Sequence, residues 1–164
     1  MIILKEDWHL LDRFGYYPFD LLRMSYRGNM LRGESVSRTL ECAYDDSCVA
    51  RFAAAIGDEE AASRFSKRSG YWKNVLDSSV GFVRGKDSKG QWRTPFDPTK
   101  IGYGPFADND FTEGNSYQYT WHVMQDPVGL VAALGGRDKS GSRLDNLFSE
   151  KVGAGSDSGS YDVT

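Results

Sequence analysis

The clearest hydrophobic pattern in the chain lies between Ser37 and Ile56, where apolar side chains recur at every fourth position. This spacing places them on one face of an α-helix. Gly57 follows, and glycine commonly ends a helix because it tolerates the left-handed conformation. We therefore predict a helix over this stretch with a buried stripe formed by Leu40, Ala43, Tyr44, Cys48, Val49, Phe52 and Ile56.

A second helix is predicted to begin after Asp58, a favourable N-cap residue. Glu59 and Glu60 would occupy its first turn, where negative charge interacts favourably with the helix dipole. Its apolar stripe would consist of Ala61, Phe65, Trp72, Val75 and Leu76.

Glycine, proline and capping residues mark the remaining segments. A short helical lead-in should close at Gly15, and the stretches without a clear period predict loops. Long ordered loops are usually functional, so the predicted loop over residues 81–107 is of particular interest. The predicted loops cover residues 20–36 and 81–107, and the further predicted helices cover 110–124, Asp126-Pro127 to Gly135-Gly136, and 142–150.

No stretch shows a convincing strand-like alternation of polar and apolar residues. Helices paired through short turns and followed by a long loop are typical of an α/α barrel or of a helical bundle, and the pattern does not separate the two. We therefore predict an all-α domain over residues 1–152 and a Gly/Ser/Asp-rich disordered tail over residues 153–164.

Composition and charge exclude several classes of protein. The 164 residues suffice for one domain, and a net charge of −3 without a basic stripe argues against a nucleic-acid partner. No apolar run is long enough to cross a membrane, and the N-terminal residues do not form a secretory signal as written. Cys42 and Cys48 would project from different faces of one helix, so both are predicted to be reduced and partly buried.

The segment from Asp110 to Trp121 carries the most suggestive chemistry, because it combines carboxylates, carboxamides, phenols and an indole at a predicted helix start. Carboxyl groups perform acid–base work on glycosidic bonds, and aromatic faces with amides suit a polyhydroxylated ligand. Glu113 is the candidate general acid, a task that requires a carboxyl group still protonated near neutral pH. Its spacing from Asp110 is also that of a capping box, and spacing alone favours this structural role.

Asn115 and Gln118 would share one helix face, where their amides could bind sugar hydroxyls or offer oxygens to Ca²⁺, or could be ordinary helix-surface residues. Asp45 and Asp46 would point about 100° apart on their helix and so cannot share one substrate atom. Of these two we choose Asp46, for an electrostatic or positioning role. The stripe of Tyr117, Trp121 and Met124 is interpreted as core.

Three residues of the long loop, Arg84, Trp92 and Asp97, could bound a sugar subsite. The preferred interpretation is structural: Arg84 pairs with a nearby acid and Trp92 covers the edge of the core. His9 and His122 are isolated and are poor candidates for zinc.

Six segments, in the same order along the chain, resemble glycoside hydrolase family 92, the calcium-dependent exo-acting α-mannosidases. Glu113-Gly114-Asn115 with Gln118-Tyr119-Thr120-Trp121 resembles the general-acid motif of the family. The other five segments are Ser37 with Thr39-Leu40-Glu41 and Ala43-Tyr44-Asp45-Asp46, Arg68-Ser69 to Val75, Gly81-Phe82-Val83-Arg84, Gly90 with Trp92 and Phe96-Asp97-Pro98, and Asp126 with Gly129-Leu130 before Gly135-Gly136.

The resemblance implies part of an (α/α)6 barrel, a Ca²⁺ cofactor, and a terminal mannose of a glycan as substrate. Glu113 would be the general acid, and Asn115, Gln118 and Asp46 would contact the substrate. An inverting glycosidase also needs a base roughly 6.5–9.5 Å from the acid. In the family this base lies downstream, and no acid after Glu113 stands in a matching context.

The chain therefore resembles an internal fragment of the catalytic domain of an α-1,2-mannosidase, which would be inactive without the remainder of the parent polypeptide and most of the calcium ligands. Family members are often secreted or periplasmic, but this chain alone does not fix the compartment. The alternatives are a non-catalytic helical carbohydrate-binding or structural domain and, third, an α/α-barrel hydrolase acting on another sugar. Uncovered helix faces should make the isolated chain associate or behave as a molten state.

Overall fold

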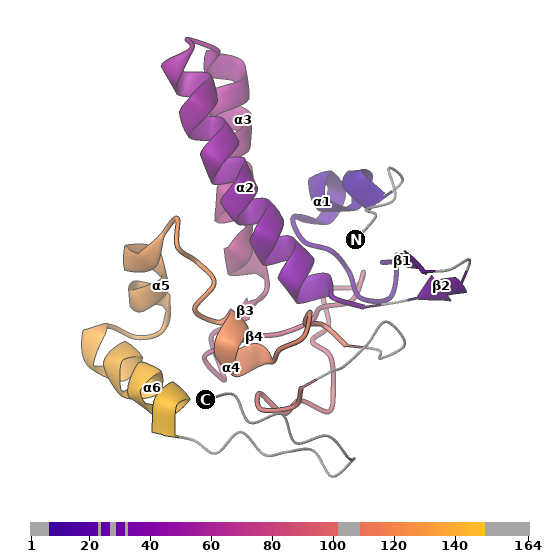
Figure 1. Ribbon diagram of the computed structural model, residues 1–164, viewed down its shortest axis with the longest axis vertical. Helices are drawn as coiled ribbons and strands as arrows, with labels where there is room; N and C mark the ends of the chain where they lie inside the picture. Colours follow the sequence, from indigo (N-terminus) through magenta and orange to yellow (C-terminus); the bar gives the residue numbers. More distant parts are fainter. Residues whose placement is uncertain (1–6, 23, 27–28, 32, 102–108, 150–164) are drawn as a thin grey trace.

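The computed structural model describes residues 7–22, 24–26, 29–31, 33–101 and 109–149, and this part of the chain is mostly helical (Figure 1). The helical elements are α1 (Trp8–Phe14), α2 (Ser35–Ala55), α3 (Glu59–Ser69), the 3-10 turn η2 (Gly70–Asn74), α4 (Ser116–Tyr119), α5 (Pro127–Ala133) and α6 (Arg137–Ser149). None of the helices in the described ranges combines the length and apolar character that crossing a bilayer requires.

The strands are β1 (Met24–Tyr26), β2 (Asn29–Leu31), β3 (Leu76–Asp77) and β4 (Phe82–Val83), which pair antiparallel as two hairpins. The prediction of an all-α chain is therefore correct for the predominant structure and wrong for these two sheets. The first hairpin lies inside the predicted loop over residues 20–36. Strands of two or three residues are too short to show a period in the sequence. The (α/α)6 barrel stays a prediction.

The longest feature is the hairpin of α2 and α3, which pack against each other and project from the rest of the molecule (Figure 1). Gly57 makes the turn with a φ of 81°, as predicted. The Asp58 carboxylate then accepts a hydrogen bond from the Ala61 amide at 3.0 Å, which confirms the predicted N-cap of α3. The end of α2 and the start of α3 are therefore set by residues in the turn itself.

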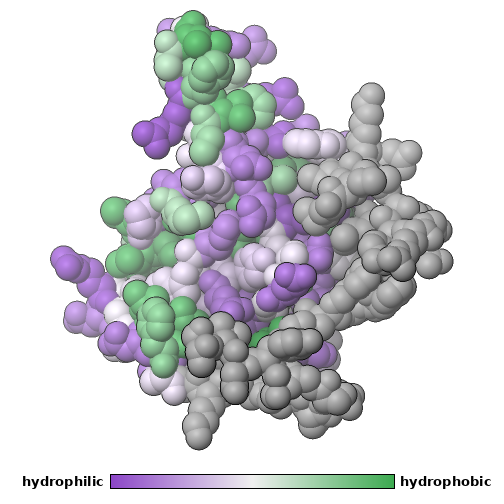
Figure 2. Space-filling model, viewed as in Figure 1, coloured by the Kyte–Doolittle hydropathy of each residue, from purple (hydrophilic) through white to green (hydrophobic). Residues whose placement is uncertain are grey.

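The predicted apolar stripe of α2 is correct at the base of the helix and wrong toward its tip. Leu40 and Ala43 are buried, whereas Phe52 is 67% exposed and Ile56 65% exposed. The face that α2 buries toward its tip carries small residues, Ala50 and Ala53. Figure 2 shows hydrophobic side chains gathered at the free end of this hairpin.

The main core lies below the hairpin, where the start of α2 meets η2, the β3–β4 hairpin and the segments around α4 and α5. Trp72 is fully buried at its centre. The second helix was predicted to reach this residue, but α3 ends at Ser69 and Trp72 lies on the 3-10 turn. The other core residues include Val36, Leu40, Val75, Val83, Phe111, Val123, Leu130 and Leu134.

Several predicted helix ends are confirmed. The helix α1 closes at Gly15 with a φ of 73°, and α5 begins with Asp126, whose carboxylate accepts from the Gly129 amide at 2.9 Å. A pair of left-handed glycines, Gly135 and Gly136, follows α5. The last helix, α6, begins directly after them rather than at the predicted residue 142. The predicted tail over residues 153–164 lies outside the described residues.

Candidate active site around Glu113

Glu113 lies on a bend and not on a helix. A helix was predicted over residues 110–124, and this prediction is wrong, because only Ser116–Tyr119 is helical. Glu113 has a φ of 49°, in the left-handed region, and Asn115 is extended. A residue with these angles cannot continue a right-handed helix. Glu113 therefore stands on the loop that leads into α4.

The helix cap at this site is made by Asn115 and Gln118. The Asn115 side-chain oxygen accepts from the Gln118 amide at 3.0 Å, and the Gln118 side-chain oxygen accepts from the Asn115 amide at 3.1 Å. This is a capping box. The predicted cap between Asp110 and Glu113 is therefore wrong, and Glu113 does not serve as a helix cap.

The two amide side chains predicted to contact the substrate are engaged in this cap. Asn115 is fully buried, and its Nδ2 donates to the Thr99 carbonyl at 3.2 Å. Gln118 is exposed on the surface of α4. The side-chain oxygens of both residues already accept a backbone N–H. A substrate role for Asn115 and Gln118 stays a prediction.

The loop that carries Glu113 is bound to the first turn of α2. The Asp110 carbonyl accepts from the amides of Val36 at 3.0 Å and Ser37 at 3.2 Å. The Thr112 amide donates to the Ser37 hydroxyl at 2.9 Å. The N-cap residue of α2, Glu34, makes no side-chain cap hydrogen bond. The loop therefore caps α2 from a distance in sequence and is held in place by doing so.

The Asp110 carboxylate connects this loop to the long loop after β4. It accepts from Arg93 through Nε at 2.8 Å and Nη2 at 3.0 Å, and from the Ser35 hydroxyl at 2.8 Å. Asp110 is only 6% exposed, so this bidentate ion pair is shielded from solvent. The Arg93 guanidinium also lies 3.9 Å from the centre of the Phe19 ring. The long loop thus supports the candidate site.

A second glutamate, Glu34, lies next to the Glu113 loop. Its φ is 62°, also left-handed. Burial raises the pKa of Glu34, while a hydrogen bond from the Thr112 side chain and the charge of Arg38 lower it. The nearby negative charge of Glu113 raises the pKa further. Two carboxyl groups therefore come within electrostatic reach of each other at this point.

The helix α4 is fixed from its other side. Val83 donates its amide to the Thr120 hydroxyl at 3.1 Å, and the Ser116 hydroxyl donates to the Val83 carbonyl. The Tyr119 hydroxyl reaches back to the Thr112 carbonyl at 2.9 Å. These contacts attach both ends of the loop to the core.

Glu113 itself is exposed and makes no hydrogen bond or ion pair with the described residues. Its neighbours in sequence are held on both sides, by α2 and by the cap of α4. A carboxyl group on a fixed backbone with no protein partner can exchange a proton with a ligand. The Glu113 side chain is therefore open to a ligand, and its role as a general acid stays a prediction.

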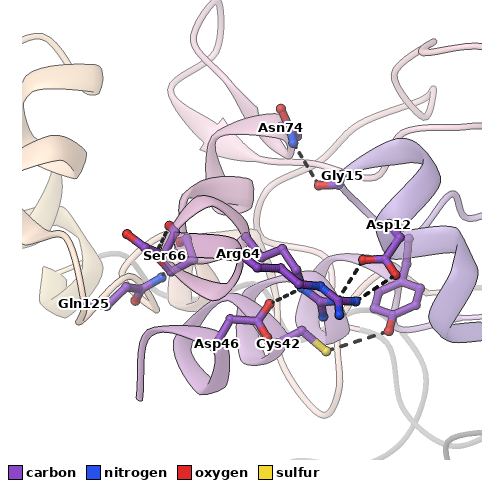
Figure 3. Close-up of polar contacts among 11 residues, drawn as sticks. Asp12, Gly15, Cys42, Asp46, Arg64, Ser66, Asn74 and Gln125 are labelled. Carbon is purple, nitrogen blue, oxygen red and sulfur yellow. Dashed lines mark hydrogen bonds and ion pairs between the residues drawn. The ribbon is translucent and has the colours of Figure 1, made fainter. Parts of the chain in front are cut away.

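Asp46 lies in a different part of the molecule. Nine residues separate it from Ser37 on α2, which corresponds to about 14 Å along the helix. Its carboxylate accepts from Arg68 Nε at 2.8 Å, and Arg68 Nη1 also donates to Asp12 at 2.9 Å. Figure 3 shows Asp46 and Asp12 on either side of this contact, between α1, α2 and α3. The structure does not bring Asp46 to the Glu113 loop.

Burial raises the pKa of Asp46, and the hydrogen bond and charge of Arg68 oppose that effect. The neighbouring Asp45 is exposed. The prediction that the two aspartates face different surroundings is confirmed. The predicted substrate contact of Asp46 stays a prediction.

The structural interpretation of the long loop is confirmed for Arg84, which pairs with Asp77 at 3.0 Å and lies 4.7 Å from the centre of the Phe96 ring. Trp92 is half-buried, with the Lys86 ammonium 4.0 Å from its ring centre. The Asp97 carboxylate accepts from the hydroxyl and amide of Thr99, and these hydrogen bonds lower its pKa.

Two further predictions about individual side chains need correction. Cys42 and Cys48 are both free, as predicted, but only Cys42 is buried and Cys48 is exposed. Of the stripe interpreted as core, Trp121 packs against the core and Tyr117 contacts Phe82 with ring centres 4.7 Å apart. Met124 is 57% exposed, because it follows the end of the short α4.

No group of three His, Cys, Asp or Glu side chains among the described residues is arranged to hold a metal ion. His122 lies 3.4 Å from Glu41, a contact that is an ion pair only when the histidine is protonated. The described part of the chain therefore does not form a calcium site from its acidic side chains.

Sequence reasoning missed the supporting residues Glu34 and Arg93. Arg93 lies 17 positions from its partner Asp110, and the contacts of Ser35 and Ser37 with the loop span 75 positions. A pattern within a short stretch of sequence cannot predict contacts between residues so far apart. The sequence predicted a helix only from Ser37 and placed Glu34 inside the loop over residues 20–36, so it gave no signal for this residue.

Comparison with known proteins identifies the family. Residues 5–164 match the family model described as the glycosyl hydrolase family 92 catalytic domain. An uncharacterized secreted glycosidase from Arthroderma benhamiae is 28% identical over 155 residues, covering 84% of this chain and 20% of the relative.

Two solved structures from Bacteroides thetaiotaomicron are similar. The family GH92 alpha-mannosidase BT3965 is 39% identical with a TM-score of 0.75, and the match covers 90% of this chain and 18% of that one. It has also been solved in complex with mannoimidazole. The family GH92 inverting mannosidase BT2199 is 33% identical with a TM-score of 0.72, covering 87% of this chain and 17% of that one.

The chain thus spans about a fifth of the length of the curated relative and somewhat less of the solved structures. The family model matches nearly all of its residues, and the structural matches agree with that assignment. The chain belongs to glycosyl hydrolase family 92.

Proposed function

We propose that this chain provides the acid-bearing part of an inverting α-mannosidase that removes terminal mannose, in α-1,2 linkage, from glycans. Glu113 is the general acid that donates a proton to the departing glycosidic oxygen. The observation that carries the proposal is the state of Glu113: its backbone is fixed by α2 and by the cap of α4, while its carboxyl group has no partner among the described residues.

Mannose as the substrate is supported by the solved relatives. One is named an inverting mannosidase, and another was solved with mannoimidazole bound. The family match does not favour the alternative of a non-catalytic carbohydrate-binding or structural domain. A screen of several α- and β-glycosides with the longer protein would expose activity on a sugar other than mannose.

The proposed enzyme works as a longer polypeptide, and this chain alone is inactive. An inverting mechanism needs a second carboxylate to activate water. After Glu113 the described acids include Asp126, which caps α5 and lies 3.7 Å from Lys73, and Asp138 and Asp145 on α6. We infer that the base and the remaining (α/α)6 barrel lie outside this chain, in keeping with the fifth of the relatives' length that it spans.

Calcium, which the family resemblance implies, does not fit the described residues by themselves. Acidic side chains do not converge there, and the side-chain oxygens of Asn115 and Gln118 accept backbone amides. We propose that most of the calcium ligands also lie outside the described part of the chain. Removal of calcium with a chelator from the longer protein should abolish mannosidase activity and be reversed by added Ca²⁺.

The test of Glu113 is Glu113→Gln in the longer protein. Glutamine keeps the shape but cannot donate the proton, so kcat on α-1,2-mannobiose should fall by about 10²–10⁴-fold. With p-nitrophenyl α-mannoside the loss should be much smaller, because p-nitrophenolate departs without protonation. Glu60→Gln, an exposed glutamate in the first turn of α3, is the matched control. Equal losses on the two substrates, or no loss on mannobiose, would rule out acid catalysis by Glu113.

A further inference from the structure

The backbone at Glu113 has a conformation that a glutamate does not favour by itself. Its φ of 49° lies in the left-handed region. This region is unfavourable for a residue with a side chain, because the Cβ atom comes too close to the following carbonyl oxygen. Such residues persist only where the surrounding structure holds them, and they cluster at functional sites. The contacts that hold this turn therefore bear on the proposed role of Glu113.

The peptide group that joins Thr112 to Glu113 is held at its carbonyl end. The Tyr119 hydroxyl donates to the Thr112 carbonyl oxygen at 2.9 Å. A peptide group is planar, so the direction of this carbonyl also sets the direction of the Glu113 N–H. Relaxation of the left-handed turn requires this plane to rotate, which would move the carbonyl away from Tyr119. The hydrogen bond from Tyr119 therefore opposes the relaxation.

The other contact of Thr112 does not fix the same peptide group. Its amide, which donates to the Ser37 hydroxyl at 2.9 Å, belongs to the peptide group before Thr112. The Asn115 amide, which donates to the Gln118 side chain at 3.1 Å, belongs to a later one. These hydrogen bonds hold the loop on either side of the turn. The bond from Tyr119 holds the peptide group at the turn itself.

The Tyr119 ring has aromatic neighbours that restrict its movement. Its centre lies 5.5 Å from the centre of the Phe111 ring and 6.0 Å from the centre of the His122 ring. The ring is half-buried and packs against the main core. The hydroxyl group is thus presented to the loop by a side chain whose ring is held between two others.

The same ring packs closely on the backbone directly after Glu113. A Cβ atom added to Gly114 would lie 3.0 Å from Cε2 of Tyr119 and 2.8 Å from the side-chain oxygen of Gln118. Separations this short leave no room for a methyl group. Glycine at position 114 therefore allows the Tyr119 side chain to lie across the turn and reach the carbonyl before Glu113.

We propose that Tyr119 is a positioning residue for Glu113. Its hydroxyl group holds the peptide group between Thr112 and Glu113 in the orientation that directs the Glu113 carboxyl group toward the departing glycosidic oxygen. This inference rests on the proposed function, in which Glu113 is the general acid. Tyr119 acts through the backbone of the loop and does not touch the substrate.

The first test is Tyr119→Phe in the longer protein, which removes one oxygen atom and keeps the ring. Displacement of a catalytic group by about 1 Å can cost about 10²-fold in rate. We expect kcat on α-1,2-mannobiose to fall about 10- to 100-fold, with KM changed less than about threefold. The loss on p-nitrophenyl α-mannoside should be much smaller, because that leaving group departs without protonation. A general loss of structure would affect both substrates.

The matched control is Tyr117→Phe, which removes a hydroxyl group from the same helix at a ring that packs on Phe82. It should leave both activities unchanged. Added to Glu113→Gln, Tyr119→Phe should lower the remaining activity less than about twofold, because no acid is left to position. Equal losses of Tyr119→Phe on the two substrates, or unchanged kcat on mannobiose, would overturn the proposal.

Hydrogen exchange in the peptide covering residues 109–115 gives a readout that does not depend on activity. Exchange should accelerate in Tyr119→Phe and stay unchanged in Tyr117→Phe, and unchanged exchange in Tyr119→Phe would count against the proposal. If Tyr119→Phe fails to fold, Gly114→Ala decides, because its methyl group displaces the Tyr119 ring. Full activity of Gly114→Ala on mannobiose would then overturn the proposal, and a loss confined to mannobiose would support it.

The proposed function can fail separately. If Glu113→Gln keeps full activity while Tyr119→Phe accelerates exchange of the loop, then Glu113 is not the acid although Tyr119 does hold the turn. If Glu113→Gln is inactive on mannobiose and Tyr119→Phe changes neither kcat nor exchange, the acid assignment stands and the positioning role is wrong.

Discussion

Asp46 and Glu113, two carboxylates in segments that resemble the same enzyme family, lie in opposite surroundings. Asp46 is 5% exposed and bound by Arg68, whereas Glu113 is exposed and unpaired within the described residues. Asp46 stands on a regular helix of 21 residues, and Glu113 stands on a strained bend held by other segments. A carboxylate that satisfies a buried cation stabilises the fold, while one left free on a fixed backbone is available to a ligand.

The two carboxylates also differ in which residues make the stabilising contacts around them. The ion pair of Asp46 joins α2 to α3, and through Asp12 it reaches the end of α1. Around Glu113 the hydrogen bonds are made by Asp110, Thr112 and Asn115, which surround the glutamate in sequence. The neighbours of Glu113 thus make the hydrogen bonds that hold the loop, and the Glu113 side chain makes none with the described residues.

The largest expected effect on stability comes from Asp46→Ala. It leaves the buried Arg68 guanidinium with only the half-exposed Asp12, so we expect a loss of about 3 kcal/mol in the free energy of unfolding. Urea denaturation measures the difference. Asp45→Ala, one position away and exposed, should cost less than about 0.5 kcal/mol. Equal losses in the two variants would remove the distinction between Asp46 and a surface aspartate.

A smaller effect is expected from the cap beside Glu113. Asn115→Ala removes the acceptor of the Gln118 amide and should destabilise the chain by about 1 kcal/mol. Asn115→Asp keeps an acceptor at this position and should retain most of the stability. Asn146→Ala, exposed on α6, serves as a neutral control in the same thermal melts. If Asn115→Asp were as unstable as Asn115→Ala, the contact with Thr99 would matter more than the cap.

The smallest effect on stability is expected at the tip of the α2–α3 hairpin. Phe52→Ser with Ile56→Ser should change the free energy of unfolding by less than about 0.5 kcal/mol, because both side chains are mostly exposed. The same change should lower concentration-dependent association of the isolated chain, measured by sedimentation velocity. Arg51→Ser, an exposed neighbour on α2, should leave association unchanged. Undiminished association of the double variant would place the adhesive surface elsewhere.

The helices that the sequence predicted well are those whose ends are set by neighbouring residues. Asp58 caps α3 and Asp126 caps α5, each through an amide three positions later. Gly57 and Gly15 supply the left-handed turns. Such signals lie within one turn of the helix and can be read without knowing the rest of the fold.

The loop at Glu113 could not be predicted in the same way. Its sequence contains two possible capping boxes, and the one chosen from spacing was wrong. The deciding contacts are those of Asp110 with Arg93 and of the loop with the start of α2. Both join segments far apart in sequence.

The buried face of α2 could also not be predicted from the sequence near the tip of the helix. The four-residue period correctly predicted a helix, but it selected the larger apolar residues as the buried side. The partner α3 covers Ala50 and Ala53 instead, which leaves Phe52 in solvent. A period fixes the type of element, and only the neighbouring element decides which side is covered.

The capping of α2 by the Glu113 loop has a consequence for the order of folding. The contacts that join them close a span of 75 residues, for which the length-dependent entropy cost is about 4 kcal/mol. Local hairpins such as α2–α3 form without that cost. We therefore expect the α2–α3 hairpin to form early, with the first turn of α2 still uncapped, and the acid-bearing loop to bind that turn later, after α4 has packed on the core. The site matures last, so mutations in the loop should mainly accelerate unfolding and leave the folding rate almost unchanged.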